Sequence, residues 1–467
     1  PGAVPGGEVV VSVPSRDMAL MLATSACGSV EDAQIQATVE QTQSRYARLG
    51  AGVLLHRGEI SRSRVILRAI VGGAEGIAFT NDISAEGLTT AREQALASAR
   101  QALPDPEHPG MPTDEQAGVP LDVDPWDEAT AVGSFDQETQ SLQAALEAAR
   151  AHDAALAGIV EHSSRARAVV NNLGLARVGR CTHSRARLIA SCGEGSGHGG
   201  ALEGCCDALD LRALGDKAGR IAALSRAPED IEPGRYDVLL EPEAVIELLE
   251  WLSMIGLGAQ SVSEGTSFLA GKSGERLTGD LVTLYDAGPE ADLLPVVFDA
   301  EGVARRRVDF VVNGIGGEVV HDRRSAGQAG CASTGHWRTS DSFPANGPGT
   351  EAVIFAPGTD SGPMLDKLGS GLHVQRFHYV NGFLDPKKAR MTGLTRDGLF
   401  EVRDGEVVRA LKDLRFTEDL LEAFGRIDGL GDTLHSVAGF WEDLYGAFAA
   451  PRVLIRDFLF SGRCTSD

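Results

Sequence analysis

The eleven histidines of the chain are the first residues to consider for metal chemistry. A zinc peptidase helix needs two histidines about one turn apart, with a glutamate between them as general base. Only this spacing lets both imidazoles reach one ion. No such pair occurs, and residues 199–320 contain no histidine. The sequence therefore predicts no zinc-binding helix in this chain.

The two histidines closest in sequence are His373 and His378, which lie in an apolar segment with strand character. Side chains alternate between the faces of a strand, so a separation of five residues predicts rings on opposite faces. We expect one ring to face the core and the other a cleft, without a shared metal. Cys331 and His336 are spaced no better for a metal site.

Other residue patterns that could carry chemistry have ordinary structural interpretations. There is no G-x-S-x-G motif for a serine nucleophile. Glu247 and Glu250 stand at helical spacing beside an apolar face, which predicts a solvated helix edge. The glycine-rich stretch 193–200 lacks both a following GK[ST] and a strand–helix context, so we expect a flexible loop within 192–204 rather than a phosphate cradle.

These residues must be positioned by a mixture of strands and helices. Residues 32–48, 50–55 and 63–79 read as a β-meander with a turn at 72–73, followed by helices near 84–103 and 135–156 and strands within 158–189. After a strand at 236–241 and a helix at 243–256, residues 281–415 are mostly strands and Gly/Asp turns. The fold class predicted is α+β, with an N-terminal α/β region and a C-terminal antiparallel β-rich domain.

A chain of 467 residues is expected to form more than one domain. Proline-rich and acidic residues at 104–125 suggest a linker, and the Pro/Gly-containing segment 227–235 is the best boundary. We expect an N-terminal α/β subdomain at 1–110, a linker with a second α/β subdomain at 111–232, and a β-rich domain at 233–467.

Composition excludes several functional classes. The formal net charge of −23 disfavours a nucleic-acid surface and would favour cationic ligands, although solubility alone explains it as well. Seven scattered cysteines without a C-x-x-C pair do not suggest a disulfide framework. No membrane span or secretion signal is recognisable, so a cytoplasmic location is expected.

Four blocks of sequence, taken in order, resemble the TldD/PmbA family, once called modulators of DNA gyrase and later placed among the metallopeptidases. The first block is 73–82, and the second comprises 234–242 and 264–275. The third comprises 298–303, 322–326 and 333–336, and the fourth 385–386, 392–398 and 414–416. Each block alone is a weak signal, but four in register span most of the chain.

The resemblance is to the TldE/PmbA-like branch of that family. In the TldD branch a helix carries the zinc-binding HExxxH motif, and a cysteine near the C-terminus completes the site. Here the matching helix, 244–252, has no histidine, the segment 439–456 has no cysteine, and Cys464 lies beyond the expected position. The resemblance thus implies no cofactor on this chain and zinc on a TldD-like partner, with which it would enclose a peptide-degrading cleft.

We therefore expect the chain to be the non-zinc subunit of a heterodimeric metallopeptidase, with no catalytic or metal-ligating residue of its own. The residues expected to line the substrate cleft are His373, Arg376, His378, Arg396 and Asp397. One alternative is a TldE-like subunit of an amide-cleaving pair in natural-product biosynthesis. Another is a homodimeric binding or scaffold protein without peptidase activity.

Overall fold

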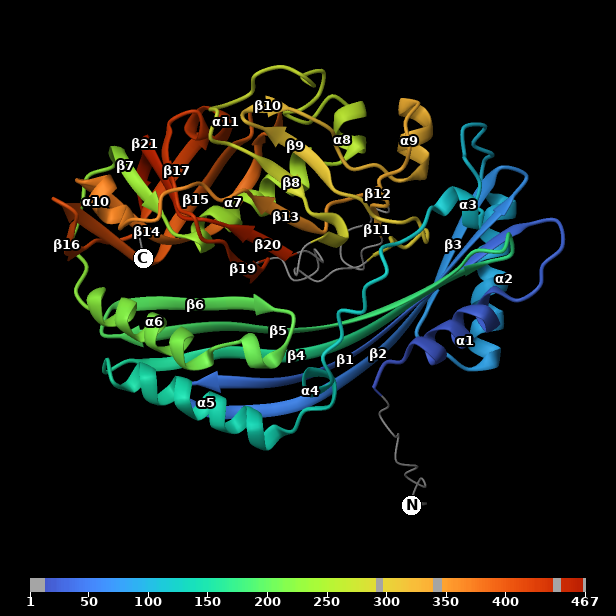
Figure 1. The fold of residues 1–467 in the computed structure, drawn as a ribbon, viewed down its shortest axis with the longest axis horizontal. Helices are drawn as coiled ribbons and strands as arrows, with labels where there is room; N and C mark the ends of the chain where they lie inside the picture. Colours follow the sequence, from blue (N-terminus) through green and yellow to red (C-terminus); the bar gives the residue numbers. More distant parts are fainter. Residues whose placement is uncertain (1–12, 291–296, 339–346, 440–446, 465–467) are drawn as a thin grey trace.

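The fold is described from a computed structural model, which covers residues 13–290, 297–338, 347–439 and 447–464. It consists of a long curved N-terminal sheet and a β-rich C-terminal part that lies over one face of this sheet (Figure 1). The α+β class is confirmed, as is the β-meander at the start of the chain. No helix in the described segments is long and apolar enough to cross a bilayer.

The N-terminal sheet has six antiparallel strands in the order β3-β2-β1-β4-β5-β6. The strands are β1 (Gln34–Gly50), β2 (Val53–Val71), β3 (Ala74–Thr80), β4 (Ala155–Asn171), β5 (Ala176–Cys192) and β6 (Gly195–Glu203). The predicted subdomains 1–110 and 111–232 each contribute three of these strands. They form one continuous sheet because β1 pairs with β4 along nearly its whole length.

Helices cover the sheet face that points away from the C-terminal part (Figure 1). They are α1 (Arg16–Cys27), α2 (Ala85–Gln101), α5 (Phe135–Arg150) and α6 (Leu211–Leu224), with the short α3 (Asp114–Ala117), α4 (Glu128–Val132) and η1 (Cys206–Ala208) in the connections. Small apolar residues dominate the packing, with α1 and α2 forming one core against the meander and α5 and α6 another against β4–β6. This leaves the opposite face of the sheet to polar side chains.

The C-terminal part contains two larger sheets around one core. The sheet nearest α7 (Pro242–Gly256) has strands β7 (Gly234–Leu240), β14 (Gly371–Asp385), β15 (Arg390–Arg403), β16 (Glu406–Ala410), β17 (Leu414–Asp419), β18 (Ile427–Leu430) and β21 (Val453–Arg463). Its pairings close into a ring, since β14 pairs with both β7 and β15. Most pairings are antiparallel, but β14–β7 is parallel.

The second sheet has the order β10-β9-β8-β13-β20-β19 and packs against the same core. Its strands are β8 (Leu284–Asp286), β9 (Val308–Val312), β10 (Ile315–Gly316), β13 (Ala352–Phe355), β19 (His435–Ala438) and β20 (Ala447–Ala450). The remaining elements are β11 (Trp337–Arg338), β12 (Gly347–Pro348), α8 (Ala259–Ser263), α9 (Arg323–Ala329), α10 (Met364–Leu368), α11 (Leu420–Phe424), η2 (Gly288–Glu290) and η3 (Pro386–Lys388).

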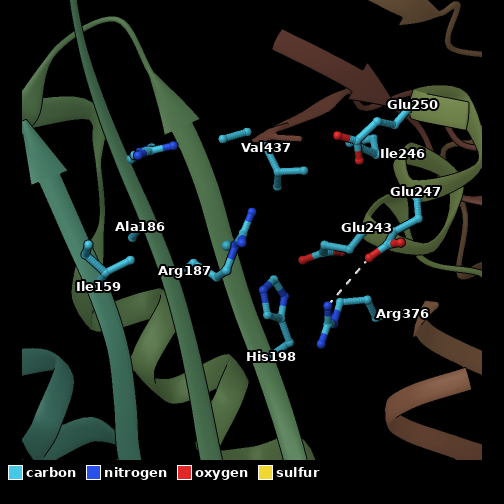
Figure 2. A pocket seen from close by; sticks show the side chains of 13 residues that line it. Ile159, Ala186, Arg187, His198, Glu243, Ile246, Glu247, Glu250, Arg376 and Val437 are labelled. Atoms are coloured by element: carbon cyan, nitrogen blue, oxygen red, sulfur yellow. Dashed lines mark ion pairs between the residues drawn. The ribbon is translucent and has the colours of Figure 1, made fainter. Parts of the chain in front are cut away.

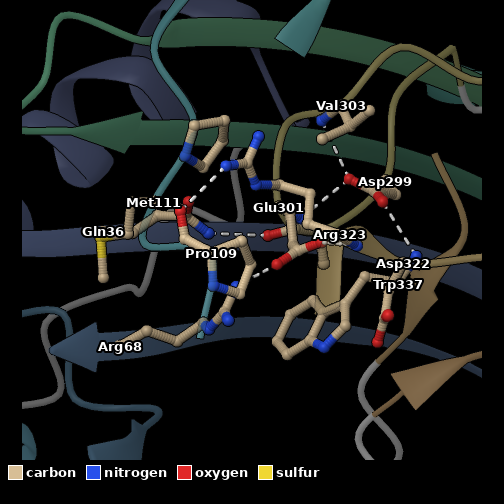
Figure 3. Close-up of polar contacts among 12 residues, drawn as sticks. Gln36, Arg68, Pro109, Met111, Asp299, Glu301, Val303, Asp322, Arg323 and Trp337 are labelled. Carbon is tan, nitrogen blue, oxygen red and sulfur yellow. Dashed lines mark hydrogen bonds and ion pairs between the residues drawn. The ribbon is translucent and has the colours of Figure 1, made fainter. Parts of the chain in front are cut away.

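A buried polar network joins the two parts of the chain (Figure 3). Arg68 on β2 forms an ion pair of 3.0 Å with Glu301 and lies 4.3 Å from the ring centre of Trp337. Asp299 accepts hydrogen bonds from the backbone N–H groups of Glu301, Val303 and Trp337 at 2.8–2.9 Å. Because these charges are buried, their pairing fixes how the C-terminal part sits on the sheet.

Candidate functional site

A pocket lies between the polar face of the N-terminal sheet and α7 of the C-terminal part (Figure 2). It spans about 570 Å³, including space that is open to solvent. Strands β4–β6 form one wall, α7 the opposite wall, and β14 and β19 the ends. Charged groups dominate the lining, which includes Arg185, Arg187, His198, Glu247 and Arg376. The site is therefore a polar cleft between two structural units, a common location for ligand binding.

Strand β6 places His198 in this pocket because its glycines let α6 approach closely. A Cβ atom at Gly199 would lie 2.5 Å from the carbonyl oxygen of Leu214, and Cβ atoms at Gly195 and Gly197 would also collide with α6. The alternate residues of the strand point to the other face, where His198 lines the pocket. The prediction of a flexible loop at 192–204 was wrong, because tertiary packing selects glycine here despite its low strand propensity.

Helix α7 is buried on nearly all sides, since it lies between the C-terminal core and the N-terminal sheet. Glu243, Glu247 and Glu250 all line the pocket from this helix and are only 1–6% exposed. The prediction that Glu247 and Glu250 form a solvated helix edge was therefore wrong. Their spacing places them on one face, but that face meets the other structural unit rather than water.

Burial controls the charge of Glu247. Removal of its carboxylate from water raises the pKa to about 8, despite the opposing charge of Arg376 at 3.6 Å, and the neighbouring Glu250 adds to the increase. Arg376 is held from its other side by Asp397, with Nε 3.0 Å from the carboxylate. At neutral pH the Glu247 side chain is thus mainly a carboxylic acid that can donate a hydrogen bond.

His198 contributes a ring nitrogen without a partner to the same pocket. Burial lowers its pKa well below the ordinary range, and the positive charges of Arg376, Lys217 and Arg187 act in the same direction, so the imidazole is neutral. Its Nδ1 atom is buried and has no hydrogen-bond partner among the described residues. Figure 2 shows the ring between Arg187 and Arg376, facing the open space.

Of the five residues predicted for the cleft, Arg376 lines this pocket. Asp397 lies behind it, buried and paired with the guanidinium. Arg396 points largely into solvent, with its side chain 54% exposed and 4.0 Å from Asp397. Asp397 thus orients the guanidinium of Arg376 in the pocket, whereas Arg396 lies outside the pocket.

The two histidines of β14 lie on either side of a β-bulge. Between Val374 and Arg376 the strand advances two residues while β15 advances three, from Leu399 to Arg396, so the extra residue belongs to β15. The placement of His373 and His378 on opposite faces stays a prediction.

His373 has a structural partner near the start of α7. Its Nε2 atom lies 2.8 Å from Glu241. Burial opposes ionisation of Glu241, but the hydrogen bond and charge of His373, together with Arg452 and Lys217, outweigh it and lower the pKa to about 2. His378 is half-buried and its ring lies 4.4 Å from that of Tyr379. Neither histidine lines the pocket beside α7.

The described residues that line this pocket do not fit a zinc ion. Within residues 13–290, 297–338, 347–439 and 447–464, no three His, Cys, Asp or Glu side chains are grouped to hold a metal. The pocket face of α7 carries three glutamates and no histidine. Instead, protonated Glu247 and the arginines offer hydrogen-bond donors, and His198 offers a ring nitrogen that can donate or accept according to its tautomer. Such a lining suits a peptide group or a carboxylate.

Sequence reasoning missed His198, Glu243, Glu247 and Glu250 as pocket residues. Helix α7 gives one partial signal. Apart from the stripe formed by the three glutamates, its residues are almost all apolar, which favours burial of most of the helix surface. No comparable signal existed for His198, because its position depends on how α6 packs against β6.

Comparison with known proteins places this architecture among characterised folds. A family model described as the PmbA/TldA metallopeptidase C-terminal domain matches residues 233–462. A protein of Methanothermobacter thermautotrophicus described as a metalloprotease is 23% identical over 262 residues, which cover 54% of this chain and 55% of that protein. The chain thus spans about half the length of this relative.

Solved structures resemble the chain over most of its length. TldE from Thermococcus kodakarensis superposes with a TM-score of 0.82 at 19% identity, covering 92% of this chain and 97% of that one. A putative modulator of DNA gyrase from Thermotoga maritima superposes with a TM-score of 0.77 at 18% identity, covering 91% and 96%. At these identities the likeness establishes the fold alone.

Proposed function

Because the chain belongs to the TldD/PmbA family, we propose that it is the non-zinc subunit of a two-subunit metallopeptidase and that its pocket beside α7 forms part of the wall of the peptide cleft. One observation carries this proposal. The helix that would bear the zinc motif in the TldD branch is buried at the pocket, where it presents Glu243, Glu247 and Glu250 instead of histidines. Zinc and the hydrolytic step then belong to a TldD-like partner.

The lining of the pocket supports a role in holding substrate. A peptide in extended conformation exposes carbonyl acceptors and N–H donors in alternation. Arg187 supplies donors from the sheet wall and Arg376 from the β14 end, protonated Glu247 supplies a further donor, and the unpaired Nδ1 of His198 can donate or accept according to its tautomer. This set matches peptide groups without contributing a nucleophile or a metal.

The proposal is tested by co-expressing this chain with a TldD-like protein from the same source. Zinc is quantified on this chain alone, on the partner alone and on the purified complex, and peptide hydrolysis is followed with each preparation. We expect zinc and activity to depend on the partner, and activity to rise in the complex. Stoichiometric zinc on this chain alone, or activity of the partner that is the same without this chain, would contradict the proposal.

A variant in the pocket separates wall function from assembly. Arg376→Met is expected to lower kcat/KM of the complex by about tenfold or more through loss of a charged hydrogen bond to substrate. Because the substitution also leaves the buried Asp397 without its ion pair, zinc content, complex formation and the Tm of the variant are measured alongside. Arg403→Met is the matched control, because Arg403 is 63% exposed and lies outside the pocket. Equal activity of the two variants would argue against a substrate contact at Arg376.

A further inference from the structure

A second hollow lies between the two parts of the chain, and four arginines line it. Arg165 and Arg167 come from β4, whereas Arg305 and Arg338 come from the C-terminal part. The hollow spans about 290 Å³, including space that is open to solvent, and shares no lining residue with the pocket beside α7. Along β4, Arg165 lies about 20 Å from Ile159 of that pocket. This second site is called the arginine cavity below.

The carboxylates that line the arginine cavity do not balance its four cations. They are Glu40 and Glu351. One oxygen of Glu40 accepts hydrogen bonds from Nη2 of Arg165 at 2.9 Å and from Nε of Arg167 at 2.8 Å. Glu351 forms an ion pair with Arg305. Among the lining residues, positive charge therefore exceeds negative charge.

Two further carboxylates act on Arg305 from behind the lining, but they do not remove the excess. Asp286 accepts hydrogen bonds from the backbone N–H groups of Glu351 at 2.7 Å and Ala352 at 3.2 Å. Asp299 is held by backbone N–H groups in the same way, and burial raises its pKa to about 7. Even with Asp286 counted in full and Asp299 in part, positive charge remains in excess.

Arg305 shows what this excess does to a buried cation. Its side chain is only 2% exposed, and its Nε atom has no hydrogen-bond partner among the described residues. Burial lowers its pKa to about 9, and the like charges of Arg167 and Arg338 act in the same direction. A buried donor without a partner and neighbouring like charges both cost free energy. An anion within the cavity would relieve both.

We propose that the arginine cavity binds an oxyanion, namely the carboxylate or phosphate group of a small ligand. Guanidinium groups suit this role because their paired N–H donors match two oxygens of such a group. Arg165 and Arg167 also line an adjoining hollow, whose other walls include the apolar side chains of Val123, Val297 and Phe298. An apolar body attached to the anionic group would find complementary surface there. The proposal does not depend on the peptidase role.

Isothermal titration calorimetry of the full chain with inorganic phosphate and with acetate, at constant ionic strength, tests the proposal. We expect saturable binding of one anion per chain. Arg165→Met and Arg338→Met, made separately, should each raise the Kd by roughly tenfold. In the first variant Glu40 keeps its ion pair with Arg167. Arg403→Met is the matched control, because Arg403 is 63% exposed and lies outside the cavity.

Glu40→Gln gives a change of opposite sign. It removes a carboxylate that competes with the ligand for two arginines, so the Kd should fall several-fold. A loss of structure would weaken binding instead, and circular dichroism and the Tm of each variant monitor folding. Tighter binding of acetate would identify the ligand group as a carboxylate, and tighter binding of phosphate as a phosphate.

Three results would overturn the proposal. The first is no saturable binding of either anion by the unmodified chain. The second is an affinity of Arg165→Met and Arg338→Met equal to that of Arg403→Met. The third is weaker binding by a folded Glu40→Gln variant, which would mean that Glu40 supports the anion rather than competing with it.

Discussion

The protonation of Glu247 makes the stability of the protein depend on pH in a direction that can be calculated. Its pKa lies at about 8 in the folded chain, against an ordinary value of 4.5. Between these values the unfolded chain has lost the proton and the folded chain retains it, so the free energy of unfolding falls as pH rises. The slope reaches at most ~1.4 kcal/mol per pH unit, so the full effect across the window is about 5 kcal/mol.

Glu247→Gln removes this dependence, because an amide of similar shape carries no titrating proton. We expect the variant and the unmodified chain to have similar stability near pH 5. The variant should become progressively more stable as pH rises to 8, by several kcal/mol at the upper end. The assay is urea unfolding at a series of pH values, read as the difference between the two proteins at each pH. Glu93→Gln on the exposed side of α2 is the control for the amide substitution itself.

The reasoning depends on burial outweighing the attraction of Arg376. If the ion pair dominated instead, Glu247 would be ionised throughout, and its replacement by Gln would destabilise the protein equally across the whole range. A stability difference that is constant between pH 5 and pH 8 would therefore refute the protonated state. A difference that grows in favour of the unmodified chain would refute it as well.

Three further predictions concern the scaffold. Arg68→Met should lower the free energy of unfolding by about 3–5 kcal/mol, because it leaves the buried Glu301 without its ion pair; thermal unfolding measures this. Gly197→Ala should lower the Tm markedly, since the added Cβ would overlap the backbone of α6. The low pKa of Glu241 makes the protein lose stability as the pH falls from about 4.5 to 2, and the hydrogen bond from His373 is the main cause of that low pKa. His373→Ala should therefore reduce this loss, which is measured as the unfolding midpoint over the acid pH range.

Each of these has a matched control on the same chain. Arg403→Met removes a mainly exposed arginine and should change stability by less than about 0.5 kcal/mol. Gly327→Ala adds a Cβ within helix α9 that meets no atom within 4 Å, and it should be neutral or stabilising. If Arg68→Met or Gly197→Ala behaved like its control, the buried network or the close helix–strand contact would be misplaced. An unchanged acid midpoint in His373→Ala would remove His373 as the cause of the low pKa.

The sequence predicts the regular N-terminal elements well because their apolar residues repeat with the period of the element. The strand 32–48 and the helix 84–103 correspond closely to β1 and α2. The turn at 72–73 falls between β2 and β3, where Gly72 and Gly73 both adopt positive φ. In these segments local preference and tertiary structure agree.

The candidate site could be predicted only in part, because it is formed by contacts distant in sequence. Arg376 was identified from its strand, but its neighbours Glu247 and His198 come from a helix and a strand that were assigned to solvent and to a loop. The bulge between β14 and β15, which shifts the pairing next to Arg376, has no signature in the sequence. Residues from both structural units meet at the pocket, and no local pattern encodes that meeting.

The alternation along β6 separates two kinds of constraint on neighbouring residues. Gly195, Gly197 and Gly199 face α6 and leave no room for a side chain, whereas His198 and Gly200, facing the other way, line the pocket. Substitutions on the first side would disturb the scaffold, but those on the second would change the pocket while the helix stays seated. A library of variants at positions 198 and 200 alone would therefore change ligand preference while the fold stays intact. Gly200 can take a larger side chain only where His198 is also replaced, because a Cβ atom at position 200 would lie 2.8 Å from the imidazole.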